Sequence, residues 1–254
     1  MKYISFSEAK NWDKCPYYHK LVNLDKIKIF KGNEYTAFGN AIHDTCESML
    51  LNEDIEPSDY FIGKYKEILK KLADDNYEFD KKLALEMKGQ GLELLPEIMP
   101  ALKEYFGKYE IVSTEEALFE DMSFEDYKFK GYVDLVLKTG DGKYHVIDWK
   151  TCSWGWNYKK KNDKMITYQL TYYKHFFAKK YDIDPKKIET HFALLKRTAK
   201  KDNVEMFRVT SGEKKTENAL NFLEKAIYNI INKNYLKNRL SCDRCEFYKT
   251  KHCT

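Results

Sequence analysis

The chain has 254 residues, of which 43% are hydrophobic and 15% aromatic, so it can bury a substantial core. Its formal net charge is only +4, which is compatible with nucleic-acid binding but does not by itself indicate it. Neither a signal peptide nor an apolar run of about 18 residues is present in the sequence. We therefore expect no membrane association and a cytoplasmic location in a bacterial, archaeal or phage-infected host cell.

The first 108 residues are predicted to form a mostly helical lobe. A short helix is expected to begin at a Ser7 cap and to stop before Pro16. Apolar periodicity predicts three longer helices, over residues 34–51, 58–75 and 80–105. We expect the last of these to be interrupted around Pro96 and Pro100, because proline lacks the amide that a helix requires.

From residue 109 onwards, runs rich in β-branched and aromatic residues predict five strands. They are expected over residues 109–120, 127–138, 143–151, 188–196 and 204–210, with helices over 164–180 and 213–237. This order predicts an α/β or α+β core. We expect one domain over 1–254, made of the helical lobe (1–108), the core (109–212) and a C-terminal helix with a cysteine cluster (213–254).

Two acidic residues interrupt apolar strands on either side of a Gly-Asp-Gly turn. Asp148 and Lys150 lie two residues apart and therefore point to one face of their strand. A three-residue turn with a left-handed Gly142 would place Asp134 opposite Asp148, whereas a two- or four-residue turn would not. We expect the three-residue turn, because two carboxylates and a lysine on one face can bind a divalent cation. The alternative is a simple ion pair on a solvated face.

At these residues the sequence resembles the PD-(D/E)XK nuclease superfamily, in particular its RecB-like exonuclease branch. The resemblance rests on GYVD at 131–134, DWK at 148–150, QLTYY at 169–173 and, upstream of these, GNAIH at 39–43. Val133 replaces the nominal proline of the pattern, and Asp148 stands where glutamate is common. The resemblance implies a restriction-endonuclease-like fold, in which a central mixed β-sheet is flanked by helices.

The resemblance also implies roles for individual residues. Asp134, Asp148, the backbone carbonyl of Trp149 and His43 would ligate Mg²⁺ or Mn²⁺, cations that favour oxygen ligands. Lys150 would position the attacking water and stabilise charge on the phosphate. The remaining implied site residues are Gln169 and Tyr173, which would face the site, and one acid of the preceding strand, for which we rank Glu116 above Glu115.

A segment between the catalytic strand and the next helix carries aromatic and basic residues. Aromatic rings can stack on bases, and lysines attract the phosphate backbone. The candidate DNA-binding residues are Trp154, Trp156, Tyr158, Lys159, Lys160 and Lys161. The alternative is a solvated charged surface.

Three cysteines lie close to the C-terminus, at positions 242, 245 and 253. From spacing alone they predict a zinc site with four thiolate ligands, with Cys15 as the best fourth ligand and His252 as an alternative. The resemblance instead implies a [4Fe–4S] cluster held by Cys15, Cys242, Cys245 and Cys253. This layout is similar to that of helicase-linked RecB-like nucleases and CRISPR-associated adaptation nucleases.

The resemblance as a whole implies a metal-dependent deoxyribonuclease, expected to be an exonuclease acting on DNA ends or single strands. No G-x-x-x-x-G-K-[ST] motif is present, so any unwinding would come from a helicase, recombination or CRISPR-adaptation partner. The alternatives are an endonuclease or flap nuclease of the same fold, or a non-catalytic nucleic-acid-binding module with a zinc site. Digestion polarity and the choice between DNA and RNA are not determined by the sequence.

Overall fold

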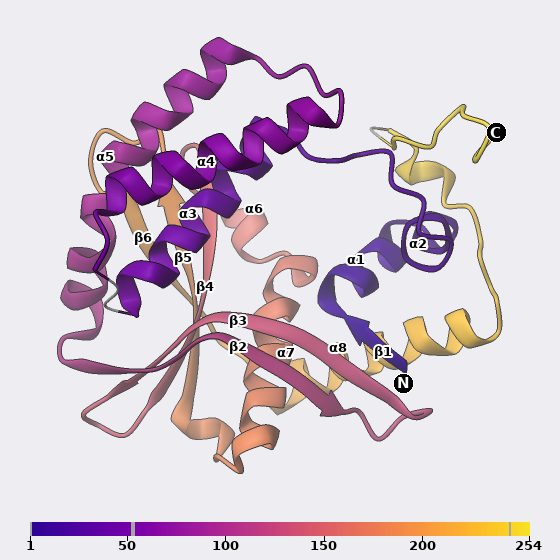
Figure 1. Cartoon of the computed structure of the whole chain (residues 1–254). Coiled ribbons are helices and arrows are strands. Elements are labelled where there is room, and N and C mark those ends of the chain that lie inside the picture. Colours follow the sequence, from indigo (N-terminus) through magenta and orange to yellow (C-terminus); the bar gives the residue numbers. More distant parts are fainter. Residues whose placement is uncertain (1, 52–53, 244) are drawn as a thin grey trace.

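A mixed six-stranded β-sheet lies at the centre of the computed structural model, which describes residues 2–51, 54–243 and 245–254 (Figure 1). The strands are β1 (Lys2–Ser5), β2 (Tyr109–Asp121), β3 (Tyr127–Thr139), β4 (Tyr144–Cys152), β5 (Ile188–Lys196) and β6 (Val204–Val209). The order is β1-β3-β4-β5-β6, and β2 also pairs with β3. β1 runs parallel to β3 and β4 parallel to β5, whereas the other pairs are antiparallel.

Helices cover both faces of the sheet, as the predicted fold class requires (Figure 1). They are α1 (Phe6–Lys14), α2 (Pro16–His19), α3 (Glu34–Leu50), α4 (Pro57–Asp74), α5 (Lys81–Phe106), α6 (Tyr158–Lys161), α7 (Lys164–Tyr181) and α8 (Glu213–Ile231). Three short turns complete the chain: η1 (Lys20–Leu24), η2 (Pro185–Lys187) and η3 (Arg239–Ser241). Among the described residues, none of these helices is both long enough and apolar enough to cross a bilayer.

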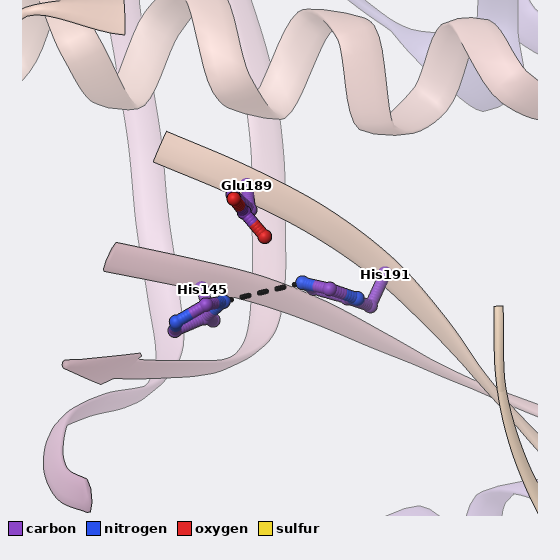
Figure 2. Close-up of side chains that lie close together, drawn as sticks. All are labelled: His145, Glu189 and His191. Atoms are coloured by element: carbon purple, nitrogen blue, oxygen red, sulfur yellow. Dashed lines mark hydrogen bonds between the residues drawn. The ribbon is translucent and has the colours of Figure 1, made fainter. Parts of the chain in front are cut away.

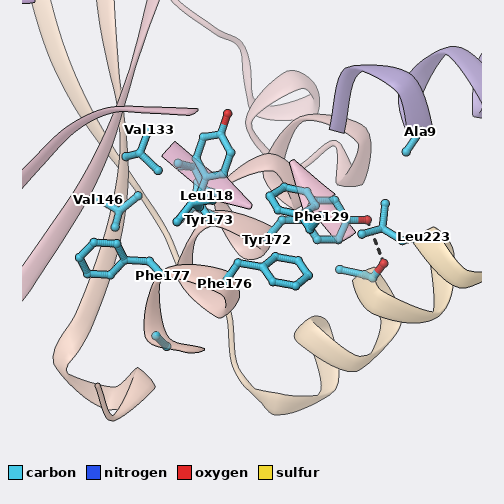
Figure 3. Packing of buried hydrophobic residues seen from close by; sticks show 14 of the residues in the cluster. Ala9, Leu118, Phe129, Val133, Val146, Tyr172, Tyr173, Phe176, Phe177 and Leu223 are labelled. Atoms are coloured by element: carbon cyan, nitrogen blue, oxygen red, sulfur yellow. Dashed lines mark hydrogen bonds between the residues drawn. The ribbon is translucent and has the colours of Figure 1, made fainter. Parts of the chain in front are cut away.

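Each face of the sheet has its own apolar core. On one face, α1, α7 and α8 pack on residues such as Phe129 and Val146 (Figure 3). The rings of Phe129 and Phe176 stack there with their centroids 4.3 Å apart. On the other face, α3, α4 and α5 cover residues such as Leu135 and Ile147. A sheet buried on both faces reads as continuous apolar runs, which is why the strands were evident in the sequence.

The β3–β4 hairpin has the predicted three-residue turn. The amide of Thr139 donates to the carbonyl of Lys143 over 3.0 Å, and Gly142 has a left-handed φ of +80°. Leu135 pairs with Ile147 in the same register. The neighbouring Asp134 and Asp148 therefore meet across the two strands, as the active-site hypothesis requires.

Three predicted helix boundaries were wrong. The first helix begins at Phe6 and is capped by Ser5, whose side chain accepts from the amide of Glu8, because residues 2–5 form an edge strand that the sequence pattern did not indicate. α5 continues through Pro96 and Pro100, which are four residues apart on its exposed side, where water can satisfy the carbonyls that lack an amide partner. α8 ends at Ile231 instead of near residue 237.

The two ends of the chain lie against each other, as Figure 1 shows for α2 and the C-terminal segment. The amide of Tyr17 donates to the carbonyl of Leu236 over 3.1 Å, and its hydroxyl donates to the carbonyl of His252 over 3.1 Å. Tyr18 donates to Glu246 over 2.8 Å and packs its ring on Phe247, which is only 1% exposed. The C-terminal segment is therefore anchored by a small apolar cluster.

Candidate active site

Two carboxylates meet where β3 and β4 leave their common register. Asp134 Oδ2 accepts a hydrogen bond of 2.7 Å from the backbone amide of Trp149. Asp148 Oδ1 accepts one of 2.7 Å from Gln169 Nε2 on α7. Asp148 Oδ2 forms an ion pair with Lys150 but accepts no well-oriented hydrogen bond, although it is buried. This oxygen therefore retains lone pairs for a further ligand.

Helix α7 supplies the polar side of the site. Gln169 Nε2 also donates to the hydroxyl of Tyr173 over 3.1 Å, so one helical turn connects Asp148 with the tyrosine. Burial and the nearby Asp148 raise the pKa of Tyr173, which keeps its hydroxyl protonated. Tyr173 can pack this closely because Gly131 has no side chain: a Cβ there would lie 2.8 Å from the tyrosine ring.

Helix α3 brings His43 to the carboxylates. Its Nδ1 lies 3.7 Å from Asp134 Oδ2. Gly39, one turn earlier, allows the helix to approach β4, because a Cβ at this position would lie 3.2 Å from the hydroxyl of Thr151. Asn33 fixes the start of α3 with a capping box that includes Thr36. The glycine and the histidine of the predicted motif are thus explained by one close helix–strand contact.

The electrostatics of the site favour a bound cation. Burial, followed by the charge of Asp148, raises the pKa of Asp134 well above its ordinary value. Burial lowers the pKa of His43, so its imidazole is neutral and can act as a ligand. Two carboxylates brought together in a buried place destabilise each other's charge unless a cation compensates them. The donor set, two carboxylates, one imidazole and the Trp149 carbonyl, fits a hard divalent metal ion.

The ligand atoms are not yet gathered as they would be around a metal. Among the described residues, His43, Asp134 and Asp148 do not form a group of ligand atoms lying within 4.8 Å of one another. His43 and Asp134 approach each other, whereas Asp148 is turned towards Lys150 and Gln169. A bound cation would have to draw Asp148 Oδ2 away from Lys150.

The structure favours Glu115, not Glu116, as the additional acid. Glu116 is nearly buried, and its carboxylate binds Lys180 and Tyr181 of α7, both over 2.6 Å. Glu115 has a left-handed φ of +46°, and its pKa is raised by burial and by the charges of Glu47, Asp44 and Asp148. The irregular backbone reverses the side-chain parity that the sequence argument assumed, so Glu115 is the acid that faces the site.

A second lysine near the site was not predicted. Burial and the charge of Lys150 lower the pKa of Lys10 on α1, and Lys160 lowers it further. Three lysines from α1, β4 and α6 therefore lie close enough to influence each other. Helix α1 carries no motif that would have indicated this, because only the tertiary packing of the helix brings Lys10 there.

The predicted DNA-binding segment is partly available and partly engaged in packing. Trp154 and Tyr158 are 76% and 84% exposed. Trp156 instead packs edge-on against Phe192, with ring centroids 5.0 Å apart. Within α6, Lys159 and Lys160 are exposed, and Lys160 lies 4.6 Å from the centre of the Trp156 ring, whereas Lys161 forms an ion pair with Glu205.

A groove on the other side of Tyr173 carries further aromatic and basic residues. Its lining includes Tyr173, Gly131, Lys130 and two exposed tyrosines, Tyr3 and Tyr132. The ammonium group of Lys130 lies 4.9 Å from the ring centre of Tyr3 and 5.7 Å from that of Tyr132. The sequence analysis did not identify these residues, because β1 and β3 are brought together only by the parallel pairing of the sheet.

The four predicted cluster ligands lie around one pocket. Cys15, Cys242, Cys245 and Cys253 all line it, together with Tyr18 and Phe247. Cys15 is buried, and its sulfur accepts a contact of 3.3 Å from the amide of Asn238. The other two cysteines lie elsewhere: Cys46 is buried in α3, and Cys152 ends β4.

Comparison with known proteins decides the family. Residues 3–250 match the family model described as the PD-(D/E)XK nuclease superfamily. The chain belongs to this superfamily. It is accordingly a nuclease, and nucleases of this superfamily generally use divalent metal ions and act on DNA. No curated protein matches the sequence.

The fold of this superfamily member is found in solved structures. One is a crystal structure from Eubacterium rectale described as "Putative exonuclease", with a TM-score of 0.60 and 13% identity over 96% of this chain and 86% of that one. Another, named SSO0001, has a TM-score of 0.40 and 18% identity over 84% of this chain and 94% of that one. The first likeness extends over nearly the whole nuclease, the helical lobe included.

Proposed function

We propose that this nuclease is a metal-dependent exonuclease that hydrolyses phosphodiester bonds at DNA ends or in single strands. The observation that carries the proposal is the meeting of Asp134, Asp148 and Lys150 at the splayed end of β3 and β4, with His43 above them. The group combines cation ligands with a positively charged side chain, which is the chemistry that attack on a phosphodiester requires.

Asp134, Asp148, His43 and the Trp149 carbonyl would hold Mg²⁺ or Mn²⁺. When bound, such a cation lowers the pKa of a coordinated water and neutralises charge on the phosphate. Lys150 would leave Asp148 and donate to the attacking water or to a phosphate oxygen. Gln169 would then hold the carboxylate in place, because its contact is to Asp148 Oδ1 and not to the oxygen that Lys150 releases.

DNA would reach this group along the basic and aromatic surfaces on its two sides. One side offers Trp154, Tyr158 and Lys159, and the other offers Tyr3, Lys130 and Tyr132. Exposed rings next to lysines suit unpaired bases, because stacking does not depend on sequence and the lysines attract the backbone. This arrangement favours a single strand or a frayed end over an intact duplex.

The comparison of linear with circular substrates tests the exonuclease activity. We expect Mn²⁺-dependent release of short products from end-labelled linear DNA, and no cleavage of a covalently closed single-stranded circle of the same sequence. Cleavage of the circle would instead support the alternative, an endonuclease of the same fold. A flapped duplex in the same series separates the flap nuclease from both.

We also propose that Cys15, Cys242, Cys245 and Cys253 hold a [4Fe–4S] cluster, as the resemblance to RecB-like nucleases implies. Tetrahedral zinc with Zn–S bonds of about 2.3 Å would hold its sulfurs about 3.8 Å apart. In the described part of the chain, no three of these sulfurs lie within 4.8 Å of one another, although all four line one pocket. This wider spacing supports the larger cluster over zinc.

A protein partner would extend this activity. The chain has no nucleotide-binding loop of the P-loop type, so duplex DNA would be opened by a separate helicase, recombination or CRISPR-adaptation protein. Stimulation of the nuclease on blunt duplex DNA by an added helicase would support such a pairing.

A further inference from the structure

A second group of metal-ligand residues lies on the sheet, away from the candidate active site (Figure 2). His145, Glu189 and His191 are the only group of at least three such side chains, within the described ranges 2–51, 54–243 and 245–254, whose ligand atoms lie within 4.8 Å of one another. His145 pairs with Glu189 across β4 and β5, and His191 follows two residues later. All three point to one face, whereas Asp148 points to the other.

The two imidazoles are spaced as zinc ligands are. His145 Nδ1 and His191 Nε2 lie 3.2 Å apart. Tetrahedral zinc with Zn–N bonds of 2.0–2.1 Å separates two nitrogens by about 3.3 Å. Both rings are buried, with only 6% and 1% of their residues' surface exposed. Phe106 lies against both, its ring centroid 4.8 Å and 5.2 Å from theirs.

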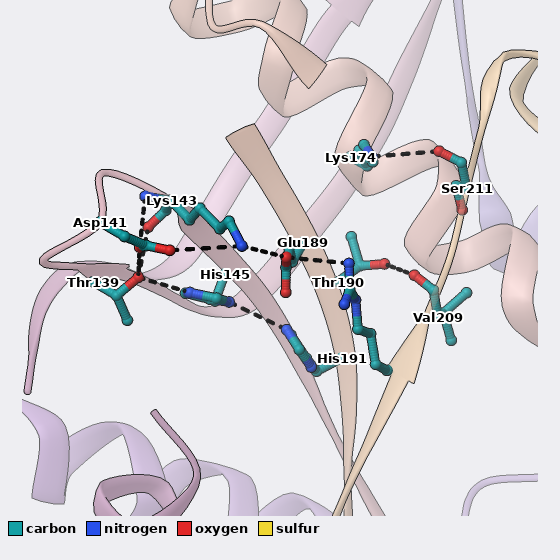
Figure 4. A network of polar contacts seen from close by, with 11 residues as sticks. Thr139, Asp141, Lys143, His145, Lys174, Glu189, Thr190, His191, Val209 and Ser211 are labelled. Carbon is teal, nitrogen blue, oxygen red and sulfur yellow. Dashed lines mark hydrogen bonds and ion pairs between the residues drawn. The ribbon is translucent and has the colours of Figure 1, made fainter. Parts of the chain in front are cut away.

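Neighbouring residues fix the tautomer of His145 (Figure 4). The hydroxyl of Thr139 donates to Asp141 over 2.6 Å, and it lies 3.0 Å from His145 Nε2. Because Thr139 has one proton and gives it to the carboxylate, its oxygen must accept from His145 Nε2–H. The lone pair of His145 therefore lies on Nδ1, which faces His191. Such hydrogen bonds orient histidine ligands at metal sites.

His191 is also ready to act as a ligand. Burial and the neighbouring His145 lower its pKa to about 3, so the ring is neutral near neutral pH. Without a metal, its Nε2–H must donate to His145 Nδ1, which leaves Nδ1 of His191 buried without a hydrogen-bond partner. A move of the proton from Nε2 to Nδ1 would free Nε2 for a cation at the cost of no existing contact other than the His145 bond.

Glu189 offers one carboxylate oxygen. Lys143 and Arg208 both contact its Oε1, over 3.0 Å and 3.1 Å, so Oε2 is not used by either cation. Lys143 also lies 3.6 Å from Asp141 and keeps this acidic partner when Glu189 binds elsewhere. Two acids and two bases balance each other here, so the charge of the surroundings neither attracts nor repels a cation strongly.

We propose that His145, Glu189 and His191 form a second metal site, which binds zinc through two nitrogens and one oxygen. This donor set favours zinc or a similar transition metal over Mg²⁺. The fourth position would be open to water. Because the ligands come from β4 and β5, a bound ion would join the two strands at the start of their parallel pairing and stabilise the folded protein.

Zinc titration of the EDTA-treated full-length protein tests this site. Excess Mg²⁺ is present throughout so that zinc does not fill the carboxylate site, and calorimetry gives the number of ions bound per chain. Zinc held by the cysteines is present in every variant and cancels in the comparison. The variants are Glu189→Gln, which keeps the size of the side chain, and His191→Ala, and the matched control is His175→Ala, a histidine of α7 outside the group.

We expect wild type and His175→Ala to bind one zinc ion more per chain than His191→Ala, and Glu189→Gln to bind this ion at least about tenfold more weakly. Zinc should also raise the melting temperature of wild type more than that of Glu189→Gln. If all four proteins bind the same number of zinc ions with the same affinity, the proposal is wrong. Should His191→Ala not fold, the comparison of Glu189→Gln with wild type decides the question alone.

Discussion

At the scale of single residues, the candidate active site stores an electrostatic cost. Asp134 and Asp148 are both buried and lie close together, and only Lys150 compensates Asp148 by charge. Functional sites often combine buried carboxylates whose pKa values are shifted in this way. The cost is relieved by protonation or by a cation, which makes the stability of the protein depend on pH and on metal.

The substitution Asp134→Asn should therefore stabilise the metal-free protein. The folded-state pKa of Asp134 is raised, so its destabilising effect is absent below the ordinary aspartate pKa of about 4 and grows as pH rises through the folded-state value. Asparagine removes the charge and can still accept from the Trp149 amide. In EDTA we expect a melting temperature higher by a few degrees at neutral pH and no gain near pH 4.

Asp141→Asn is the matched control for this prediction. Its carboxylate is exposed, and hydrogen bonds from Thr139 and from the Lys143 amide lower its pKa. A lowered pKa has the opposite sign, so this substitution should leave stability unchanged or slightly reduced above pH 4. A destabilised Asp134→Asn protein at neutral pH would contradict the electrostatic account of the site.

At the scale of secondary structure, close backbone contacts position the site. Gly39 allows α3 to approach β4, and Gly131 allows the ring of Tyr173 to lie on β3. These glycines belong to the sequence motifs that the resemblance identified, and the structure gives their physical reason. They act on the orientation of His43 and Tyr173, not on the chemistry itself.

The substitution Gly131→Ala should destabilise the protein and lower its activity. A Cβ at this position would lie 2.8 Å from Tyr173 and 2.9 Å from Phe129, two rings that are packed in the core. Such overpacking typically costs about 1–3 kcal/mol. The expected result is a lower midpoint of urea unfolding, with a reduced rate of DNA cleavage under conditions where the variant is folded.

Gly63→Ala is the control for this prediction. Gly63 lies inside α4, and a Cβ there meets no atom within 4 Å. Alanine should stabilise the helix by about 0.5–1 kcal/mol because it restricts the unfolded chain. Equal loss of stability in both variants would show that the space at Gly131 is not what determines the effect.

The strands and longer helices could be predicted because their apolar patterns are local. The site was predictable where one strand or one turn decides it: the Asp148–Lys150 spacing and the turn at Gly142 both follow from the sequence. The choice of Glu116 failed because the left-handed backbone at Glu115 is not visible in a pattern that assumes regular alternation. Lys10 and Tyr3 were missed because only tertiary packing places them near the site.

At the scale of the whole molecule, the two ends of the chain close on each other. Cys15 and the C-terminal cysteines line one pocket, and Tyr17 and Tyr18 bind the C-terminal segment. A cluster held by these four thiolates would close a loop that contains most of the chain. Closing so long a loop removes much conformational entropy from the unfolded state.

Anaerobic purification of wild type and of Cys15→Ala tests the cluster. We expect about four iron atoms per wild-type chain and a brown colour, and loss of both in the variant together with a lower melting temperature. Cys46→Ala is the matched control: Cys46 is a buried cysteine outside the pocket, and the variant should keep its iron. One zinc ion and no iron in the wild-type protein would show that the cysteines form a zinc site instead.

The most direct test of the account is Mn²⁺-dependent cleavage of end-labelled single-stranded DNA by wild type, Lys150→Ala and Lys159→Ala. Lys150 contacts Asp148, whereas Lys159 is exposed on α6. We expect wild type to cleave only with metal, Lys150→Ala to lose at least about 100-fold in rate, and Lys159→Ala to change mainly the apparent substrate affinity. Cleavage by Lys150→Ala at the wild-type rate, or equal cleavage by all three proteins in EDTA, would contradict it.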